Sequence, residues 1–380
     1  MKFGIISELN MHNANYGNRL QAYALNSYLN KKYNNNYFES LYFDFYDKNY
    51  ITKNYIKNYI KLNLKKMKNI FFKTNKENNM IKKRVYNANK FTFKYINLSC
   101  KSISWKDLSK LNYDAFIVGS DVVWSQVKNN IHRLRFLNFK TMKKYKKISY
   151  SASFGKNWVP KENEKILKKM LDDFDFISVR EKNSLELLKK IGITNAVHTV
   201  DPTLLLKKED WRKIEKKVVI DKKYIFVYLL GKDIDARRKI SEFALKNNLL
   251  IVNIPNANEV YDKVDDVFGD IKLNDCSPEE WIYLIDNAEY IITDSFHGTV
   301  FSTIFEKKFL VFKRNTKVDI NNRMTDYLSN ISQSDKFVDN FENVDRMEWD
   351  YTTINNNLSN LIIFSKEYLD KAIGCVENVK

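Results

Sequence analysis

The chain has 380 residues, of which 44% are hydrophobic and 14% aromatic, so it can build two domains with cores of ordinary size. No apolar run approaches the roughly 20 residues that span a bilayer, and the N-terminal apolar stretch is too short for a signal peptide, so we expect a cytoplasmic protein. The three cysteines lie far apart and form no CxxC pair, which argues against a disulfide framework and a cysteine-based zinc site.

The formal net charge is +18, and much of it lies in one stretch. Residues 48–110 hold 17 Lys and Arg against two acids, with Tyr, Ile and Phe interleaved at about helical spacing. This pattern predicts a pair of amphipathic basic helices. They could bind an anionic surface such as the inner face of the cell membrane, or they could be a solvated face in a chain rich in Lys and Asn. Nucleic acid is not expected, because no nucleic-acid-binding motif accompanies the charge.

The first half of the chain alternates predicted strands and helices. A strand at 2–7 precedes a helix over 19–32 with one apolar face. Further strands are short apolar runs, typical of parallel sheets, at 38–45, 114–121, 147–155 and 175–181. A helix over 182–192 is closed by Gly192.

A second strand–helix series follows the polar segment 207–223. Ser277, Pro278 and Glu280 form a capping box that starts one of its helices. The predicted strands are 224–231, 249–255, 289–293 and 309–314, and the predicted helices are 235–248, 277–288 and 295–307. A last helix is expected at about 357–373.

Two such series predict an α/β fold with two doubly wound, Rossmann-like domains that face a cleft. We assign residues 1–206 to the N-terminal domain, with the basic helical insertion at about 48–110. Residues 207–345 form the C-terminal domain. Residues 346–380 form a helical segment that could cross back onto the first domain.

His297 is the first candidate for chemistry. It lies in "DSFHG", the turn between the strand at 289–293 and the following helix, where Asp294 or Ser295 can cap the helix. Ligands of open α/β sheets bind at the carboxyl ends of strands, beside free N–H groups and the positive end of a helix dipole. Gly298 leaves room for close approach. We therefore expect His297 to face the cleft as a proton donor, rather than to fill the core, and its removal to leave folding little changed.

Six segments carry a family resemblance in this order: "NYGNRLQAYAL", "FIVGSDVVW", "SYSASFG", "ISVREKNSLELLKKIG", "VDPTLLL" and "YIITDSFHGTVFSTIFEKKFLVF". Together they cover about residues 3–330. The chain resembles the polysaccharide pyruvyltransferase family, whose members look like two-domain GT-B enzymes. The resemblance implies transfer of an enolpyruvyl group from phosphoenolpyruvate to a sugar of a cell-surface polysaccharide, with a pyruvate ketal and phosphate as products. It also implies that His297 is the general acid.

One position departs from the family. Better studied members carry an Arg two residues before the His to hold the donor anion, and here that position is Ser295. The anion could be held by Arg180, which ends a strand, or by Arg314 and Arg323, together with the N–H groups around Ser295. The departure also leaves open a different donor, such as a nucleotide-sugar.

The remaining candidates follow from the chemistry that the resemblance implies. Asp121 ends the strand at 114–121 and could act as a base or bind sugar hydroxyls, or it could simply cap a helix. Arg180 could instead pair with Glu181. The loop before the first helix offers acceptor-binding residues, and these are Asn15, Gly17 and Asn18.

No metal site or further cofactor is predicted. A single Gly in the first strand–helix loop falls short of a dinucleotide fingerprint, and we find no Walker A loop, no HExxH and no clustered carboxylates. We expect the second domain to bind the donor and the first to bind a glycan or lipid-linked saccharide acceptor. Two alternatives remain: a GT-B-like glycosyltransferase that uses a nucleotide-sugar, and a non-catalytic protein that binds a glycan or a membrane surface.

Overall fold

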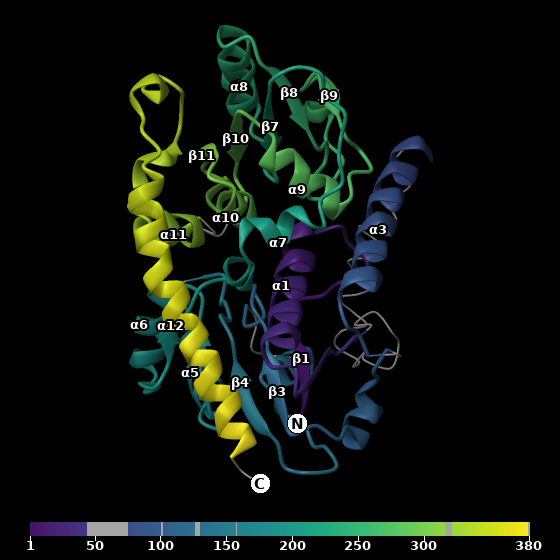
Figure 1. The fold of residues 1–380 in the computed structure, drawn as a ribbon, viewed down its shortest axis with the longest axis vertical. Coiled ribbons are helices and arrows are strands. Elements are labelled where there is room, and N and C mark those ends of the chain that lie inside the picture. Colours follow the sequence, from purple (N-terminus) through teal and green to yellow (C-terminus); the bar gives the residue numbers. More distant parts are fainter. Residues whose placement is uncertain (44–74, 100–101, 126–129, 157, 316–320, 379–380) are drawn as a thin grey trace.

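The computed structural model describes residues 1–43, 75–99, 102–125, 130–156, 158–315 and 321–378 (Figure 1). Two lobes follow one another along the long axis of the molecule, each built around its own parallel sheet. We call residues 1–206 the first lobe and residues 207–345 the second lobe. The arrangement confirms the predicted α/β fold with two Rossmann-like units.

The first lobe contains a parallel sheet of order β2-β1-β3-β4, and β5 pairs with β6 beside it. The strands are β1 (Lys2–Ile6), β2 (Tyr37–Ser40), β3 (Ala115–Val118), β4 (Lys146–Ser149), β5 (Ser178–Val179) and β6 (Val197–His198). Isolated bridges from Ile148 to Phe176 and from Ala152 to Val179 connect β4 with β5. The helices are α1 (Tyr16–Lys32), α4 (Asn130–Arg135), α5 (Lys161–Leu171) and α6 (Asn183–Lys190), with 3-10 turns η2 (Trp105–Lys110) and η3 (Pro202–Leu205). The carboxyl ends of these parallel strands lie along one edge, which faces the second lobe.

The second lobe contains one parallel sheet of order β12-β11-β10-β7-β8-β9. Its strands are β7 (Tyr224–Tyr228), β8 (Leu250–Asn253), β9 (Ile271–Lys272), β10 (Tyr290–Thr293), β11 (Lys308–Phe312) and β12 (Phe337–Val338). Its helices are α7 (Lys208–Arg212), α8 (Ile234–Lys246), α9 (Pro278–Asp286), α10 (Phe296–Ile304) and α11 (Asn322–Asn330), with 3-10 turns η4 (Lys263–Asp265), η5 (Ser334–Lys336) and η6 (Val344–Arg346). The strand order reverses between β7 and β10, and open α/β sheets bind ligands at such a point.

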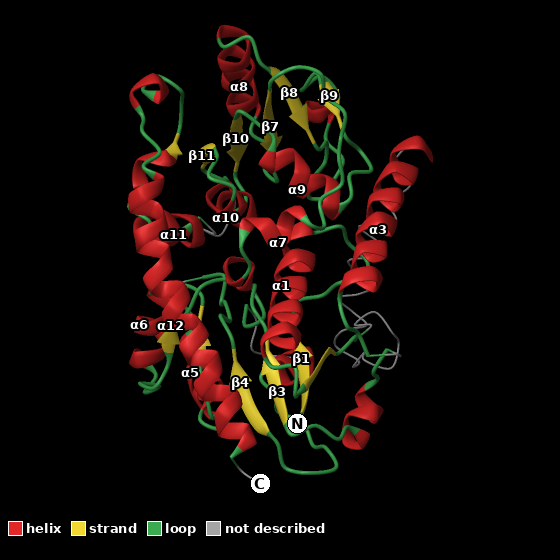
Figure 2. Ribbon diagram, in the orientation of Figure 1, coloured by secondary structure: helices red, strands yellow, loops and turns green. Residues whose placement is uncertain are grey.

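Most predicted elements are present, although the strands are shorter than the apolar runs suggested (Figure 2). The predicted capping box at Ser277 is confirmed, with its hydroxyl accepting from Glu280 N. Helix α1 begins at Tyr16, three residues earlier than predicted, because the Asn15 side chain accepts from Asn18 N and caps the helix. Gly192 has a φ of +84°, as expected for a residue just after a helix end.

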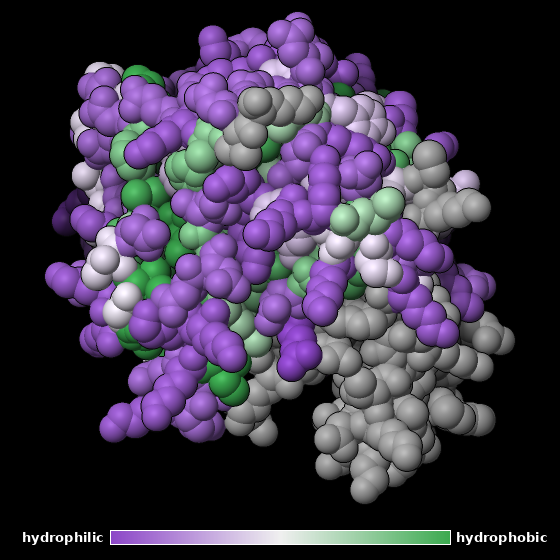
Figure 3. Space-filling model, turned by 90° about the horizontal axis from the view of Figure 1, so that it is seen from below, coloured by the Kyte–Doolittle hydropathy of each residue, from purple (hydrophilic) through white to green (hydrophobic). Residues whose placement is uncertain are grey.

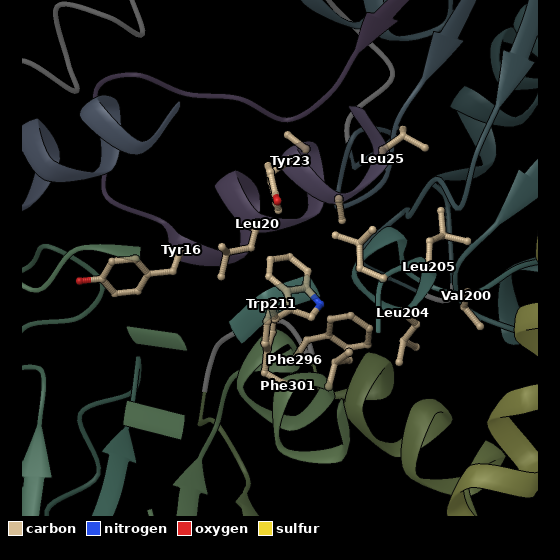
Figure 4. Close-up of a cluster of buried hydrophobic side chains, with 14 of the residues drawn as sticks. Tyr16, Leu20, Tyr23, Leu25, Val200, Leu204, Leu205, Trp211, Phe296 and Phe301 are labelled. Atoms are coloured by element: carbon tan, nitrogen blue, oxygen red, sulfur yellow. The ribbon is translucent and has the colours of Figure 1, made fainter. Parts of the chain in front are cut away.

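The two lobes share a hydrophobic core where they meet (Figure 4). Trp211 of α7 is fully buried and packs edge-on against Tyr23 of α1 and Phe301 of α10, with ring centroids 5.5 and 4.7 Å apart. Leu20 of α1 and Leu204 of η3 belong to the same cluster. Trp211 therefore connects helix α10 with helix α1 of the other lobe.

The last helix, α12 (Tyr351–Glu377), is longer at both ends than predicted and runs beside both lobes. In the second lobe, the Tyr351 hydroxyl donates to Ser302 O over 3.3 Å. In the first lobe, the Tyr368 hydroxyl donates to Ser149 O over 2.7 Å, and the Ser365 hydroxyl accepts from Val200 N over 2.9 Å. The helix thus contacts both lobes and connects them along one side of the molecule.

The predicted basic insertion, residues 48–110, lies in part outside the described residues. Its described portion contains one long helix, α3 (Asn75–Tyr95), which packs on α1 and α9 and therefore touches both lobes. Ala88 and Phe91 of α3 are fully buried, whereas Tyr86 and Phe93 are exposed. In the described part of the insertion, the helix thus has one face buried in the protein and one face free.

Among the described residues, no helix combines the length and the apolarity that crossing a membrane requires. The described residues on the face shown in Figure 3 are mostly hydrophilic, with smaller hydrophobic areas between them.

Candidate functional site

Three charged side chains and one histidine meet where the two lobes touch, and we call Asp121, Arg180, Asp201 and His297 the charged cluster. Asp121 follows β3, Arg180 follows β5, and Asp201 follows β6, so all three stand at the carboxyl edge of the first sheet. His297 comes from the first turn of α10 in the second lobe. The four residues are only 2–6% exposed. The fold therefore assembles them in a buried interface, where electrostatic interactions are strong.

His297 is held between the lobes. Its Nε2 lies 3.5 Å from Asp201 Oδ2, and the other side of the ring lies against Gly17 of α1. A Cβ added at Gly17 would be 2.0 Å from His297 Nδ1, so only glycine permits this contact. The prediction that His297 faces the cleft is wrong for this conformation, because the ring is 6% exposed and buried between Gly17 and Asp201.

Asp201 is the residue that connects His297 to the first lobe, and sequence reasoning missed it. One carboxylate oxygen accepts from Thr203 N and so caps the N-terminus of η3. The other oxygen accepts from the Ser120 hydroxyl and from Arg180 Nη1. Burial raises the pKa of Asp201, but the neighbouring His297 and Arg180 outweigh it and hold the pKa well below its ordinary value. The available signal was its place before Pro202 at a strand end, within the "VDPTLLL" segment.

Arg180 binds carboxylates on three sides. Its Nε is 2.9 Å from Glu181, and its Nη1 is 3.1 Å from Asp201 and 3.6 Å from Asp121. Burial lowers the pKa of Arg180, but these carboxylates outweigh it and raise the pKa above its ordinary value. The guanidinium also stacks on the Phe296 ring at 4.1 Å. The simple ion pair with Glu181 is thus present, and it is one contact of a larger network.

Asp121 stands at the centre of this network with a φ of +65°, a left-handed conformation that costs free energy in a non-glycine residue. Its carboxylate accepts from Asn18 of α1 and from Val122 N. The same carboxylate lies 3.9 Å from Arg323 Nη1 of α11. A turn follows Asp121 instead of a helix, so the alternative interpretation as a helix cap is wrong. Strained residues that are held by their surroundings often mark functional sites.

Two guanidinium groups face one another across Asp121, those of Arg180 and Arg323. Burial and the charge of Arg180 lower the pKa of Arg323. Within the described part of the chain, Arg180 Nη2 and Arg323 Nε are buried and have no hydrogen-bond partner. A cavity of about 20 Å³ adjoins both side chains. Unpaired N–H groups of this kind are ready to receive an anion or a water molecule.

Ser295 and Gly298 stabilise the turn between β10 and α10. Ser295 caps α10 by accepting from Gly298 N, and Ser295 N donates to the Thr293 hydroxyl. A Cβ at Gly298 would be 2.4 Å from that same hydroxyl, so the glycine allows the helix to approach its own strand. The amides of Phe296 and His297 are the first two of the helix and have no carbonyl one turn earlier within it.

Arg314, which follows β11, binds the carboxylate of Asp294, which follows β10, with Nε 3.3 Å from Oδ2. Asp294 also accepts from the backbone N–H groups of Leu230 and Gly231 after β7, each over 2.7 Å. One carboxylate therefore joins three strand ends at the point where the strand order reverses.

A hollow of about 560 Å³ opens beside Arg314, between the loop before α1 and the strand ends of the second lobe. Of the predicted acceptor-binding residues, Asn15 lines this hollow, whereas Gly17 contacts His297 and Asn18 contacts Asp121. Seven of its eleven lining residues have charged or amide side chains, and four of these are carboxamides. The lining consists of Asn13, Asn15, Tyr228, Leu230, Gly231, Lys232, Ala257, Asn258, Glu259, Arg314 and Asn315.

Metal ligands are not grouped in the described residues, where no set of three or more His, Cys, Asp or Glu side chains is placed to hold an ion. The polar groups of the charged cluster and of the hollow are instead suited to anions and to hydroxyl-rich ligands.

The family assignment comes from the sequence. The profile of the family described as polysaccharide pyruvyl transferase matches residues 15–316, most of the chain and all of the charged cluster. The chain belongs to the polysaccharide pyruvyl transferase family. It is therefore a transferase. No curated protein matches the sequence significantly.

Solved structures resemble this family member in fold. The UDP-N-acetylglucosamine 2-epimerase from Rickettsia bellii has 12% sequence identity and a TM-score of 0.51, and the match covers 100% of this chain and 98% of that one. The UDP-GlcNAc 2-epimerase from Methanocaldococcus jannaschii, in complex with UDP-GlcNAc and UDP, has 14% identity and a TM-score of 0.50, covering 83% of this chain and 85% of that one. At this level of identity the likeness establishes only the GT-B-like fold.

Proposed function

We propose that this pyruvyl transferase moves the enolpyruvyl group of phosphoenolpyruvate to two hydroxyls of a polysaccharide sugar, forming a pyruvate ketal and releasing phosphate. The observation that carries the donor assignment is the pair of buried guanidinium groups, Arg180 and Arg323, each with an unpaired N–H. Arg180 also contacts Asp201, the carboxylate that contacts His297. A donor with a carboxylate and a phosphate supplies the two anionic groups that such a pair can bind.

Arg323 offers a physical explanation for Ser295. It comes from α11 and reaches Asp121 from the second lobe, so it can bring a guanidinium to the site where position 295 does not. Arg314 is committed to Asp294 and is the weaker candidate for the donor anion. We therefore assign the donor to Arg180 and Arg323, together with the first amides of α10.

The site must open before the donor can bind. The cavity of about 20 Å³ beside the two arginines has room for about one water molecule and not for phosphoenolpyruvate. His297 and Asp201 are also closed in, at 6% and 2% exposure. We infer that the donor displaces Asp121 from the arginines, or that α10 moves away from α1, and that the negative charge of the donor replaces that of the carboxylate.

The proposed chemistry proceeds in two additions. His297 gives a proton to the methylene carbon of the donor while a sugar hydroxyl forms a bond to the adjacent carbon and loses its proton to Asp121. The phosphate then leaves with its bonding electrons and takes the proton from Asp121, and the second hydroxyl adds to the same carbon and gives its proton to the imidazole of His297. Asp201 holds the imidazole through the 3.5 Å contact and is a positioning residue in this scheme. The sugar would enter from the hollow that Asn15 lines.

Phosphate release tests the proposal. Purified protein is mixed with phosphoenolpyruvate and a panel of oligosaccharides, and the product is examined by NMR for the methyl signal of a ketal. We expect phosphate and ketal to appear together, and both to disappear in His297→Ala. Arg180→Lys and Arg323→Lys should weaken donor binding, because a lysine cannot bind an anion in two places. Phosphate release without a ketal would contradict the transfer.

Ligand-dependent stabilisation separates the donor classes. A ligand at 100 times its Kd stabilises the folded protein by about 2.7 kcal/mol, which is visible as a higher Tm. We expect phosphoenolpyruvate to raise Tm and a panel of nucleotide-sugars to leave it unchanged. The reverse result would favour the glycosyltransferase alternative.

Contact with an anionic membrane stays a prediction, as does the cytoplasmic location. The basic stretch supports it through its sequence, since each Lys or Arg near an anionic surface contributes about 1 kcal/mol. Flotation with neutral and with anionic liposomes is the measurement. Equal recovery with both would exclude electrostatic binding.

A further inference from the structure

Helix α3 contacts the loops on both sides of the hollow. Near its middle, Asn87 Nδ2 donates to Asp275 O over 2.6 Å, which joins α3 to the second lobe. Two residues later, Asn89 Nδ2 donates to Met11 O over 2.9 Å, which joins α3 to the loop before α1 in the first lobe. The helix belongs to the insertion between β2 and β3, so it is added to the sheet topology rather than part of it.

Arg84 makes the strongest of these connections. Its side chain is 1% exposed, and each of its three nitrogens donates to a different backbone carbonyl of the second lobe. Nε donates to Asn274 O over 2.8 Å, Nη1 to Asn256 O over 3.0 Å, and Nη2 to Pro255 O over 2.7 Å. The planar guanidinium carries N–H donors on three sides, so it can bind three carbonyls at once. A lysine ammonium cannot reproduce that geometry.

Two of the three carbonyls that Arg84 binds, those of Pro255 and Asn256, belong to the loop after β8. Asn256 and Glu259 both have positive φ, at 51° and 64°, and such residues persist only when neighbouring contacts hold them. Asp265 accepts from Asn256 N over 2.9 Å and supplies one such contact, and Arg84 supplies two more. In the same loop, the carboxylate of Glu259 accepts from Ala14 N, which joins this loop to the loop before α1.

The opposite wall is held by the same helix. Arg19 of α1 is fully buried and donates to the Asn89 side chain over 2.8 Å and to Asn13 O over 3.0 Å. Burial lowers the pKa of Arg19 to about 10, so the group stays protonated at neutral pH. Asn89 thus connects α3 to the loop that carries Asn13 and Asn15, two residues that line the hollow.

We propose that Arg84 is a positioning residue for a ligand in the hollow, and that α3 fixes the distance between its two walls. One wall, residues 255–259, is bound through Arg84, and the other, residues 10–15, through Asn89. This assignment goes beyond the proposed transfer reaction, because it concerns the shape of the hollow and needs no particular donor. Arg84 itself does not line the hollow.

Hydrogen exchange tests the assignment without any ligand. In Arg84→Met, we expect amides in residues 8–15 and 254–260 to exchange about fivefold to tenfold faster, with residues 293–300 unchanged. Lys83→Ala is the matched control on the same helix, since Lys83 makes only a partly exposed ion pair with Asp275. Leu188→Ala, in the separate core of the first lobe, controls for general loss of stability. Faster exchange confined to α3, or equal in Arg84→Met and Leu188→Ala, would overturn the proposal.

Kinetics provide the second readout, with the acceptor oligosaccharide that supports phosphate release. We expect Arg84→Met to raise the acceptor KM about tenfold while kcat stays within about twofold, because the lost contact shapes binding and not the proton transfer. Arg84→Lys should recover only part of the affinity. A fall in kcat with an unchanged KM would contradict a positioning role. Failure of the proposed transfer reaction would remove this second readout but would leave the exchange experiment decisive.

Discussion

The charged cluster and the hollow lie side by side at the junction of the lobes, yet they differ in how water reaches them. The members of the cluster are 2–6% exposed, and their charges are satisfied mainly by one another. The hollow is lined by exposed side chains such as Asn15, Lys232 and Asn315. Under the proposed function, catalysis and acceptor recognition are therefore built differently. The cluster depends on charges that are preorganised in a buried interface, and the hollow depends on the placement of loops.

The largest effect should come from removing His297. If it is the general acid, His297→Ala should lower turnover by about 10²–10⁴-fold, and His297→Gln should be nearly as inactive, because Gln cannot give up a proton. Since the ring is buried, we now expect a loss of stability of about 1 kcal/mol as well, measured by urea unfolding. Turnover near the parent rate in either variant would rule out the catalytic role. It would also remove the proposed difference in role between the charged cluster and the hollow.

Asp201→Asn should show how strongly the cluster depends on charge. The substitution keeps the shape but removes the carboxylate that faces Arg180 and His297. We expect a loss of about 3 kcal/mol in unfolding free energy, at the low end for a broken buried pair because Glu181 and Asp121 remain. The control is Asp286→Asn, whose partner Arg212 is 46% exposed, with an expected loss of at most about 1 kcal/mol. Equal losses in both variants would mean that burial does not strengthen the cluster.

Gly17→Ala tests whether the lobes meet as closely as the cluster requires. The new Cβ would lie 2.0 Å from His297 Nδ1, so the lobes must part or the imidazole must move, at a cost of about 1–3 kcal/mol. Adding His297→Ala should remove most of this cost in a double-mutant cycle. Gly374→Ala in α12 is the matched control, because its added Cβ meets nothing within 4 Å and should stabilise the helix by up to about 1 kcal/mol. Additive effects of the two substitutions would contradict the contact.

His198 provides a pH-dependent test beside the cluster. Burial lowers its pKa in the folded protein, and its Nε2 donates to Arg180 O over 3.0 Å. Below about pH 6.5 the unfolded chain binds a proton that the folded protein does not, so stability contributed by neutral His198 is present above that pH and lost as the pH falls. The loss should be at most about 1.4 kcal/mol per pH unit. His198→Gln should show a flatter dependence between pH 7.5 and 5.5, and an unchanged slope would argue against this assignment.

The smallest effect is expected in the hollow. Lys232 forms a 2.8 Å ion pair with Asp262, in which the two side chains are 47% and 33% exposed. Lys232→Ala should therefore change the unfolding free energy by less than about 1 kcal/mol, as measured by urea unfolding at low and high salt. A loss as large as that of Asp201→Asn would remove the distinction between the two regions.

Much of the fold could be predicted because its signals are local. Apolar runs that end in small or charged residues predicted the parallel strands, and the capping box at Ser277 predicted the start of a helix. The same local reasoning placed His297 in the first turn of a helix after a strand, and Asp121 and Arg180 at strand ends, where they are found. These positions follow from the spacing of apolar residues in each strand and helix. They also follow because the carboxyl ends of parallel strands lie at the same edge of a sheet.

The contacts that define the site were decided only by the tertiary structure. Asp201 meets His297, Gly17 admits its ring, and Arg84 binds carbonyls about 170–190 residues away, and none of these pairs has a signature within one stretch of sequence. The burial of His297 was missed for the same reason, since it results from the contacts of its ring with Gly17 and Asp201 of the other lobe. Local propensities determine which elements form and where each begins, whereas the side chains that come together depend on how complete hydrophobic faces pack between lobes.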